Sequence, residues 1–164
     1  YEFVVDADVD EWRVALDVNV VGTMTVCKFI VPYMLKAQCG SVINISSRIM
    51  RQGMMRRSAY SASKAALVLF SQSLADEVGQ DQVRVNCVVP GHIWSDRLKT
   101  FYEQRAKMLD KTYDEVHSMY TDMMALKRIP TPEEISNTII FLASDLSSAI
   151  TGQTVDVNAG HYYH

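Results

Sequence analysis

Three short runs rich in β-branched residues, each separated from the next by a stretch of helical period, constrain the fold of this chain most strongly. They are "SVINIS" (41–46), "VRVNCVV" (83–89) and "QTVDVN" (153–158). The stretches between them are long enough to hold a crossover helix, which neighbouring parallel strands require. Strands that are mostly apolar along their length are typical of a parallel sheet buried on both faces. We therefore expect an α/β fold in which helices cover both faces of a parallel sheet.

Capping patterns predict where several helices begin. A glutamate follows three positions after each of Asp8, Thr112 and Thr131, which is the spacing of a capping box. From Asp8 the helix is expected to continue to Met34, with a bend near Pro32. The other expected helices are 60–78, which Gly79 would end, and two amphipathic helices within 96–126.

Composition and charge exclude several classes of function. The chain has 164 residues, of which 48% are apolar, and this suits one domain with its own core. A net charge of −3 gives no general attraction to nucleic acid or to an anionic membrane, and no uninterrupted apolar run approaches the length that a bilayer requires. The four histidines lack metal-ligand spacing, so no metal site is expected. The three cysteines are far apart and form no C-x-x-C pair, which favours a reducing compartment such as the cytoplasm.

The stretch "SAYSASK" (58–64) carries the clearest chemical signal. Tyr60 and Lys64 are four positions apart, so on a helix both side chains lie on one face. A phenol titrates near 10 in water, and about 4 kcal/mol is needed to make it a base near pH 7. One cation about 4 Å away, at an effective dielectric constant of about 20, supplies about that amount. The pair predicts a general acid/base with small residues leaving room for a ligand, although a long helix can also contain this spacing by chance.

Two further polar residues strengthen this interpretation. Ser47 follows the first strand, and a hydroxyl at the carboxyl end of a parallel strand lies where open α/β sheets bind ligands. Asn19 stands in a valine-rich part of the preceding helix. Taken alone, Asn19 is more simply explained by a hydrogen bond between packed helices.

Together these residues resemble the short-chain dehydrogenases/reductases, which are single-domain Rossmann enzymes that use NAD or NADP. The resemblance extends over nearly the whole chain, in the family's order and spacing, through "LDVNVVGT", "GSVINISS", "SAYSASKAAL", "VRVNCVVPGHIWS", "TPEEISNTIIFLASD" and "AITGQTVDVNAG". It implies a Rossmann-like fold and an NAD- or NADP-dependent oxidoreductase that interconverts a small secondary alcohol and a ketone. Because family members commonly form dimers or tetramers, a homodimer or homotetramer is expected.

The resemblance also implies a role for each of these residues. Tyr60 would be the general acid/base, and Lys64 would favour its ionised form and hold the nicotinamide ribose. Ser47 would orient and polarise the substrate oxygen, and Asn19 would hold a water that extends a proton relay from Lys64. The segment after the second strand would border the nicotinamide through Pro90, Gly91, Ile93 and Ser95, where Ser95 replaces the family's usual threonine.

The substrate is less well defined by the sequence. Region 95–128 resembles the family's mobile substrate lid, and its pattern is similar to polyol, diol and hydroxy-acid dehydrogenases. Its methionines and tyrosines could line a pocket, but packing between helices explains them better. Candidate substrate residues are Arg57, Met54 and Trp94. The planar fork of Arg57 could clamp a carboxylate, phosphate or sulfonate, or Arg57 could be a solvated side chain on an exposed loop.

The family's glycine-rich phosphate loop does not occur in these residues, nor does the N-N-A-G run that normally precedes the first helix. At roughly 30 residues per βα unit, about 90 residues of the domain are expected to be missing. The chain is therefore expected to be the catalytic half of one Rossmann domain and to bind a dinucleotide poorly by itself. Three functions stay open: a dehydrogenase recorded without its first part, a catalytically inactive truncated relative that acts as an assembly partner, and an epimerase or dehydratase on the same scaffold.

Overall fold

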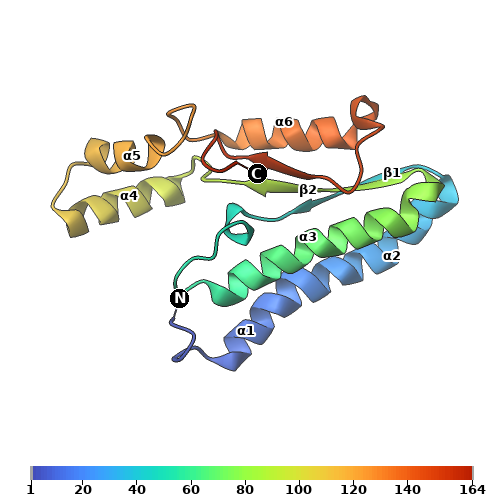
Figure 1. The fold of residues 1–164 in the computed structure, drawn as a ribbon, viewed down its shortest axis with the longest axis horizontal. Helices are drawn as coiled ribbons and strands as arrows, with labels where there is room; N and C mark the ends of the chain where they lie inside the picture. The colour runs from blue at the N-terminus through green and yellow to red at the C-terminus, as the bar shows by residue number, and fades with distance from the viewer. Residues whose placement is uncertain (1, 164) are drawn as a thin grey trace.

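The fold is a parallel sheet between two layers of helices, as the sequence predicts (Figure 1). The structure is a computed structural model that describes residues 2–163. Its strands are β1 (Gly40–Ile45), β2 (Val83–Pro90) and β3 (Thr154–Val157), parallel and in the order β1-β2-β3. Each strand agrees with its predicted range to within one residue at either end.

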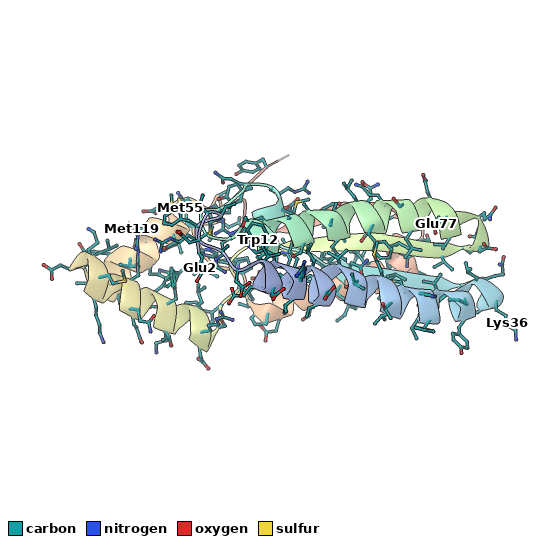
Figure 2. All side chains as sticks on the ribbon, turned by 90° about the horizontal axis from the view of Figure 1, so that it is seen from below. Glu2, Trp12, Lys36, Met55, Glu77 and Met119 are labelled. Atoms are coloured by element: carbon teal, nitrogen blue, oxygen red, sulfur yellow. The ribbon has the colours of Figure 1, made fainter. Side chains whose placement is uncertain are left out.

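Helices cover both faces of the sheet and bury β2, whereas most residues of β1 and β3 are half-buried. On one face, α2 (Gly22–Ala37) and α3 (Ser58–Val78) pack against β2 through a core that includes Val31 and Leu74. On the other face, α6 (Pro132–Ala143) packs through Leu142. Figure 2 shows α2 and α3 side by side from below, with Lys36 and Glu77 at the same end of the pair.

The first helix is less regular than predicted. The Asp8 side chain caps α1 (Val9–Leu16), but it accepts the N–H of Asp10 rather than completing a box with Glu11. The helix then passes through a π-helical segment, Asp17–Val21, before it continues as α2. Pro32 lies within α2, and the α-helical hydrogen bonding is interrupted around residue 19, where the sequence predicted no irregularity.

The other helix boundaries follow the sequence closely. Thr112 and Thr131 complete capping boxes at the starts of α5 (Tyr113–Thr121) and α6. At the end of α3, Gly79 is the C-cap as expected, although it keeps a helical φ and leads into a short 3₁₀ turn (Gly79–Asp81).

Region 95–128 forms a unit at one end of the sheet. It contains α4 (Asp96–Leu109) and α5, which extend beyond the sheet in Figure 1. The two helices share a small core with the segment that follows them, made of Tyr102, Ala106, Val116, Met124 and Ile129. The predicted role in helix packing therefore holds for Tyr102 and Met124, whereas Met108, Met119 and Met123 are exposed and do not belong to this core.

The helical stretch Val9–Ala37 is long and apolar enough to cross a membrane by length and composition. Its apolar residues are interrupted by small and polar ones, so a search for uninterrupted runs misses it. One such helix is a weak indication, since the core helices of soluble proteins pass the same test. Within the described residues its outer face is uncovered, with Val18, Phe29 and Tyr33 exposed.

The packing of α6 gives a stability test with an internal control. Leu142 is 1% exposed and Leu146, four residues later, is 83% exposed. We expect Leu142→Ala in the full-length protein to lower the free energy of unfolding by about 2–5 kcal/mol, because it removes buried contacts and leaves a cavity. Leu146→Ala should change it by less than about 0.5 kcal/mol. Urea unfolding measures both, and equal losses would contradict this assignment of the core.

Candidate active site

Two reciprocal hydrogen bonds fasten α3 to the end of β1. The Ser46 hydroxyl donates to the carbonyl of Lys64 (2.8 Å), and the Lys64 ammonium donates to the carbonyl of Ile45 (2.9 Å). The backbone N–H of Ser46 also extends the sheet by donating to Val88 (2.8 Å). We call this arrangement the Ser46–Lys64 clamp. It fixes the first turns of α3 over the carboxyl end of the sheet, where Ser47 follows.

Tyr60 and Lys64 lie on one face of α3, one turn apart, as predicted. The Lys64 ammonium is 5.8 Å from the centroid of the Tyr60 ring. Burial lowers the pKa of Lys64 from its ordinary value, and the nearby Cys87 opposes this shift. The ammonium has N–H donors besides the one given to Ile45, so it can also bind the hydroxyl groups of a ligand.

Asn19 reaches the same turn of α3 from the π-helical segment. Its side-chain amide donates to the Ser63 hydroxyl (3.2 Å), and that hydroxyl donates to the carbonyl of Tyr60 (2.9 Å). Ser63 is fully buried, so it does not leave room for a ligand as expected. Its small size instead lets the helix carrying Asn19 approach α3 closely enough for this hydrogen-bonded bridge.

The residues predicted to border a nicotinamide follow the end of β2. Pro90 is buried at the end of the strand, and Ile93 packs against the core under α6. A Cβ on Gly91 would lie 2.8 Å from the Cβ of Asn158, so only glycine permits this approach of β2 to the end of β3. The Ser95 hydroxyl caps α4 by accepting the N–H of Leu98 (3.2 Å).

The predicted substrate residues are distributed over more than one hollow. Arg57 and Tyr60 line a small cavity of about 170 Å³ with Trp12. Met54 lines a second cavity of about 300 Å³, between the loop before α3 and the end of α5. Trp94 packs edge-on against His117 of α5 and is 39% exposed. Among residues 2–163, no three or more metal-ligating side chains lie together as a metal site.

A polar cluster that sequence reasoning missed lies beside the second cavity. The Arg48 guanidinium donates to the Tyr162 hydroxyl (3.0 Å) and contacts Nε2 of His92 (3.1 Å). Nδ1 of His92 in turn contacts the hydroxyl of Tyr102, which is fully buried (3.2 Å). These residues come from the segments after β1, β2 and β3 and from α4, and no spacing in the sequence relates them. The only signal was the arginine next to Ser47.

A family model described as enoyl-(acyl carrier protein) reductase matches residues 2–162. The chain belongs to the short-chain dehydrogenase/reductase family. Similar curated proteins include the 3-oxoacyl-[acyl-carrier-protein] reductases of Chlamydia muridarum and Aquifex aeolicus, 36% and 35% identical over 92% and 93% of this chain. The chain spans 56% and 57% of the lengths of these two relatives.

Solved structures of short-chain dehydrogenases/reductases agree with this assignment. A 3-oxoacyl-[acyl-carrier protein] reductase from Brucella melitensis is 31% identical, with a TM-score of 0.83 over 99% of this chain and 57% of that one. A reductase of the same description and organism, with bound NAD, is 29% identical, with a TM-score of 0.82 over 99% of this chain and 56% of that one. The predicted family and its Rossmann-like fold are therefore confirmed, and NAD or NADP is the cofactor of this family.

The cluster around His92 predicts how stability depends on pH in this short-chain dehydrogenase/reductase. Burial, Arg48 and His161 lower the pKa of His92 from 6.5 to about 4. Between these values the unfolded state binds more protons, so stability is complete above about pH 6.5 and falls as the pH drops toward 4. We expect a loss of about 3 kcal/mol from this group.

Urea unfolding at a series of pH values between neutral and acidic checks this prediction. His92→Gln removes the titrating ring and should make the fall in stability with decreasing pH shallower. His161→Gln should also make the fall in stability with decreasing pH shallower, because burial and Arg48 lower the pKa of His161 as well. An unchanged slope in His92→Gln would show that the acid sensitivity arises elsewhere.

Proposed function

We propose that the full-length protein is an NAD- or NADP-dependent oxidoreductase that interconverts a secondary alcohol and a ketone, with Tyr60 as the general acid/base. The observation that carries this proposal is the placement of Tyr60 and Lys64 on one face of α3, held at the carboxyl end of β1 by the Ser46–Lys64 clamp. That edge of an open α/β sheet is where ligands bind. The relatives named as reductases of a 3-oxoacyl group support the same class of reaction.

The chain's own residues would handle the proton. In the reductive direction the Tyr60 hydroxyl would donate its proton to the oxygen of the ketone, and in the oxidative direction its phenolate would accept it. The cation of Lys64 would favour the phenolate. Ser47, which directly follows the clamp, would donate a hydrogen bond to the reacting oxygen. Asn19 would hold the water of a relay from Lys64 as well as bracing α3 through Ser63.

The residues that are present suit the nicotinamide half of NAD or NADP. Lys64 keeps N–H donors for the ribose hydroxyls, and Gly91 directly follows the end of β2, at the edge of the sheet where ligands bind. Pro90, Ile93 and Ser95 would complete this wall. When bound, the nicotinamide would supply or accept the hydride, which is the chemistry that the protein itself lacks.

The substrate of this reaction is proposed only as a class of compounds. The relatives are named for 3-oxoacyl chains on a carrier protein, whereas the lid sequence is similar to polyol, diol and hydroxy-acid dehydrogenases. Both groups of substrate contain a ketone or a secondary alcohol. Arg57, Met54 and Trp94 remain candidates for contacts with either group. The region 95–128 would act as the lid. A homodimer or homotetramer and a cytoplasmic location also stay predictions, the latter supported by three free cysteines.

A catalytically inactive relative that serves in assembly is the second candidate. It is supported by β1, which has a neighbouring strand on one side only in the described sheet. An open strand edge invites pairing with another segment or chain. Turnover separates the two functions, because only the oxidoreductase consumes NADH or NADPH in the presence of a ketone.

Replacing the phenol tests the proposed function. We expect Tyr60→Phe to lower kcat/KM for ketone reduction by about 10²- to 10⁴-fold, the usual contribution of general acid/base catalysis. Tyr33→Phe is the matched control, because Tyr33 is 74% exposed on α2, and it should retain full activity. Absorbance of NADH and NADPH with a panel of ketones and 3-oxoacyl thioesters gives the rates.

The outcomes are distinct. An active protein whose Tyr60→Phe variant keeps its rate would overturn the role of Tyr60. A folded full-length protein that oxidises neither NADH nor NADPH with any ketone of the panel would favour the assembly function instead.

A further inference from the structure

Arg48 is a half-buried cation that lines a cavity without a carboxylate partner. It belongs to none of the ion pairs found among residues 2–163, which join Arg13 to Asp10, Arg51 to Asp156 and Arg128 to Glu134. Its hydrogen bonds go to Tyr162 and His92, and its guanidinium lies 5.5 Å from the centroid of the Tyr162 ring. A guanidinium has more N–H donors than these two contacts use, so donors remain for a ligand.

The contrast with Arg51 shows that the local fold can neutralise an arginine. Arg51 lies three residues later, follows the same 3₁₀ turn (Arg48–Met50), and is similarly enclosed. It is paired with Asp156 of β3 at 2.8 Å. Taking a charge out of water is costly unless it is paired. Arg51 therefore has its counter-ion within the chain, whereas Arg48 is positioned to take one from outside.

The neighbours of Arg48 hold it in place without changing its charge. Because Nε2 of His92 faces the guanidinium, this nitrogen acts as an acceptor, and Nδ1 carries the proton toward the Tyr102 hydroxyl. Burial and Arg48 hold the pKa values of His92 and His161 below their ordinary range, so both rings are neutral near pH 7. Burial likewise raises the pKa of Tyr102, which keeps its hydroxyl protonated. One uncompensated positive charge therefore remains in the cluster.

The cavity beside Arg48 has a partly apolar wall, as expected for a site that binds a carbon chain. Its volume is about 300 Å³, and its apolar lining comes from Met54, Met55 and Met123. Methionines adapt to ligands of irregular shape. His161 and Tyr162 also line the cavity and give it a polar side.

The cavity is also close in the chain to the proposed catalytic residues. Arg48 directly follows Ser47, and Met54 and Met55 lie in the loop that leads to Tyr60. Met54 and Met55 therefore connect the cavity to the start of α3, where Tyr60 lies. Tyr120 and Met123, from α5 and the turn after it, close the other side.

We propose that Arg48 is a specificity-determining residue that binds an anionic group, a carboxylate or a phosphoryl group, at the far end of a ketone substrate. The three methionines would hold the carbon chain between the anion and the carbonyl. This inference rests on the proposed function, because it names the substrate class of the same site.

A matched pair of substrates tests the anion site directly. The probes are 4-oxopentanoate and its methyl ester, extended to longer oxo acids with their esters and to the corresponding oxo phosphonates. Wild-type full-length protein should reduce an acid of suitable length with a higher kcat/KM than its ester. Preference for carboxylates or for phosphonates then identifies the natural anionic group.

Variants of Arg48 distinguish a role in substrate specificity from a purely structural role. Arg48→Gln should lower kcat/KM for the preferred anion by about 10- to 150-fold, as expected for lost hydrogen bonds to a charged group, and leave the ester within about threefold. Arg48→Lys should retain part of the preference, because it keeps the charge but not the fork. Arg13→Gln removes the same charge from a side chain that is 71% exposed, and it should change neither rate.

Failure of this inference can be distinguished from failure of the proposed function. If the protein reduces acids and esters equally, or if Arg48→Gln slows both alike, Arg48 is structural and the anion site is wrong while the oxidoreductase stands. If no ketone is reduced, calorimetric titration of 4-oxopentanoate with NAD⁺ present decides. Binding that Arg48→Gln abolishes would retain the anion site without the reaction, and the absence of binding would overturn it.

Discussion

The Ser46–Lys64 clamp is the interaction on which the rest of the site depends. It uses one hydroxyl and one ammonium to join a strand end to a helix, and both acceptors are backbone carbonyls. Backbone acceptors cannot rotate away, so the positions of Tyr60 and Lys64 follow from the positions of β1 and α3 rather than from flexible side chains. Preorganisation of this kind is what general acid/base chemistry requires, because small displacements of a reacting group lower rates steeply.

The segment between β1 and α3 has two proposed tasks. Its first residue, Ser46, belongs to the clamp, Ser47 is proposed to bind the reacting oxygen, and its last residues lead into the turn of Tyr60. Between them, Arg48 turns toward the ends of β2 and β3, where His92 and Tyr162 hold it. The residues proposed for the proton chemistry and for the recognition of an anion therefore belong to different parts of this segment.

The sequence predicted those features that depend on short-range patterns. The strand ranges, the capping boxes at Thr112 and Thr131, and the shared face of Tyr60 and Lys64 all follow from local periodicity and local hydrogen bonds. The hydrogen bond of Asn19 to a packed helix was one of the two explanations that the sequence offered, but its partner Ser63 was predicted as a small spacer, because the sequence does not show which residue a serine meets. The Arg48 cluster was missed for a similar reason: its members are far apart in sequence and are brought together only by the parallel order of the strands.

The π-helical segment Asp17–Val21 changes what the long first helix can do. An α-helix turns by about 100° per residue, so one extra residue in a turn rotates everything before it relative to everything after it. The side chains before and after this segment therefore point in directions that differ from those of a regular α-helix. Asn19 at the junction faces Ser63, and Cys27 and Val31 face the core. The wider turn therefore lets one continuous helix place the Asn19 amide at Ser63 and the side chains of Cys27 and Val31 in the core.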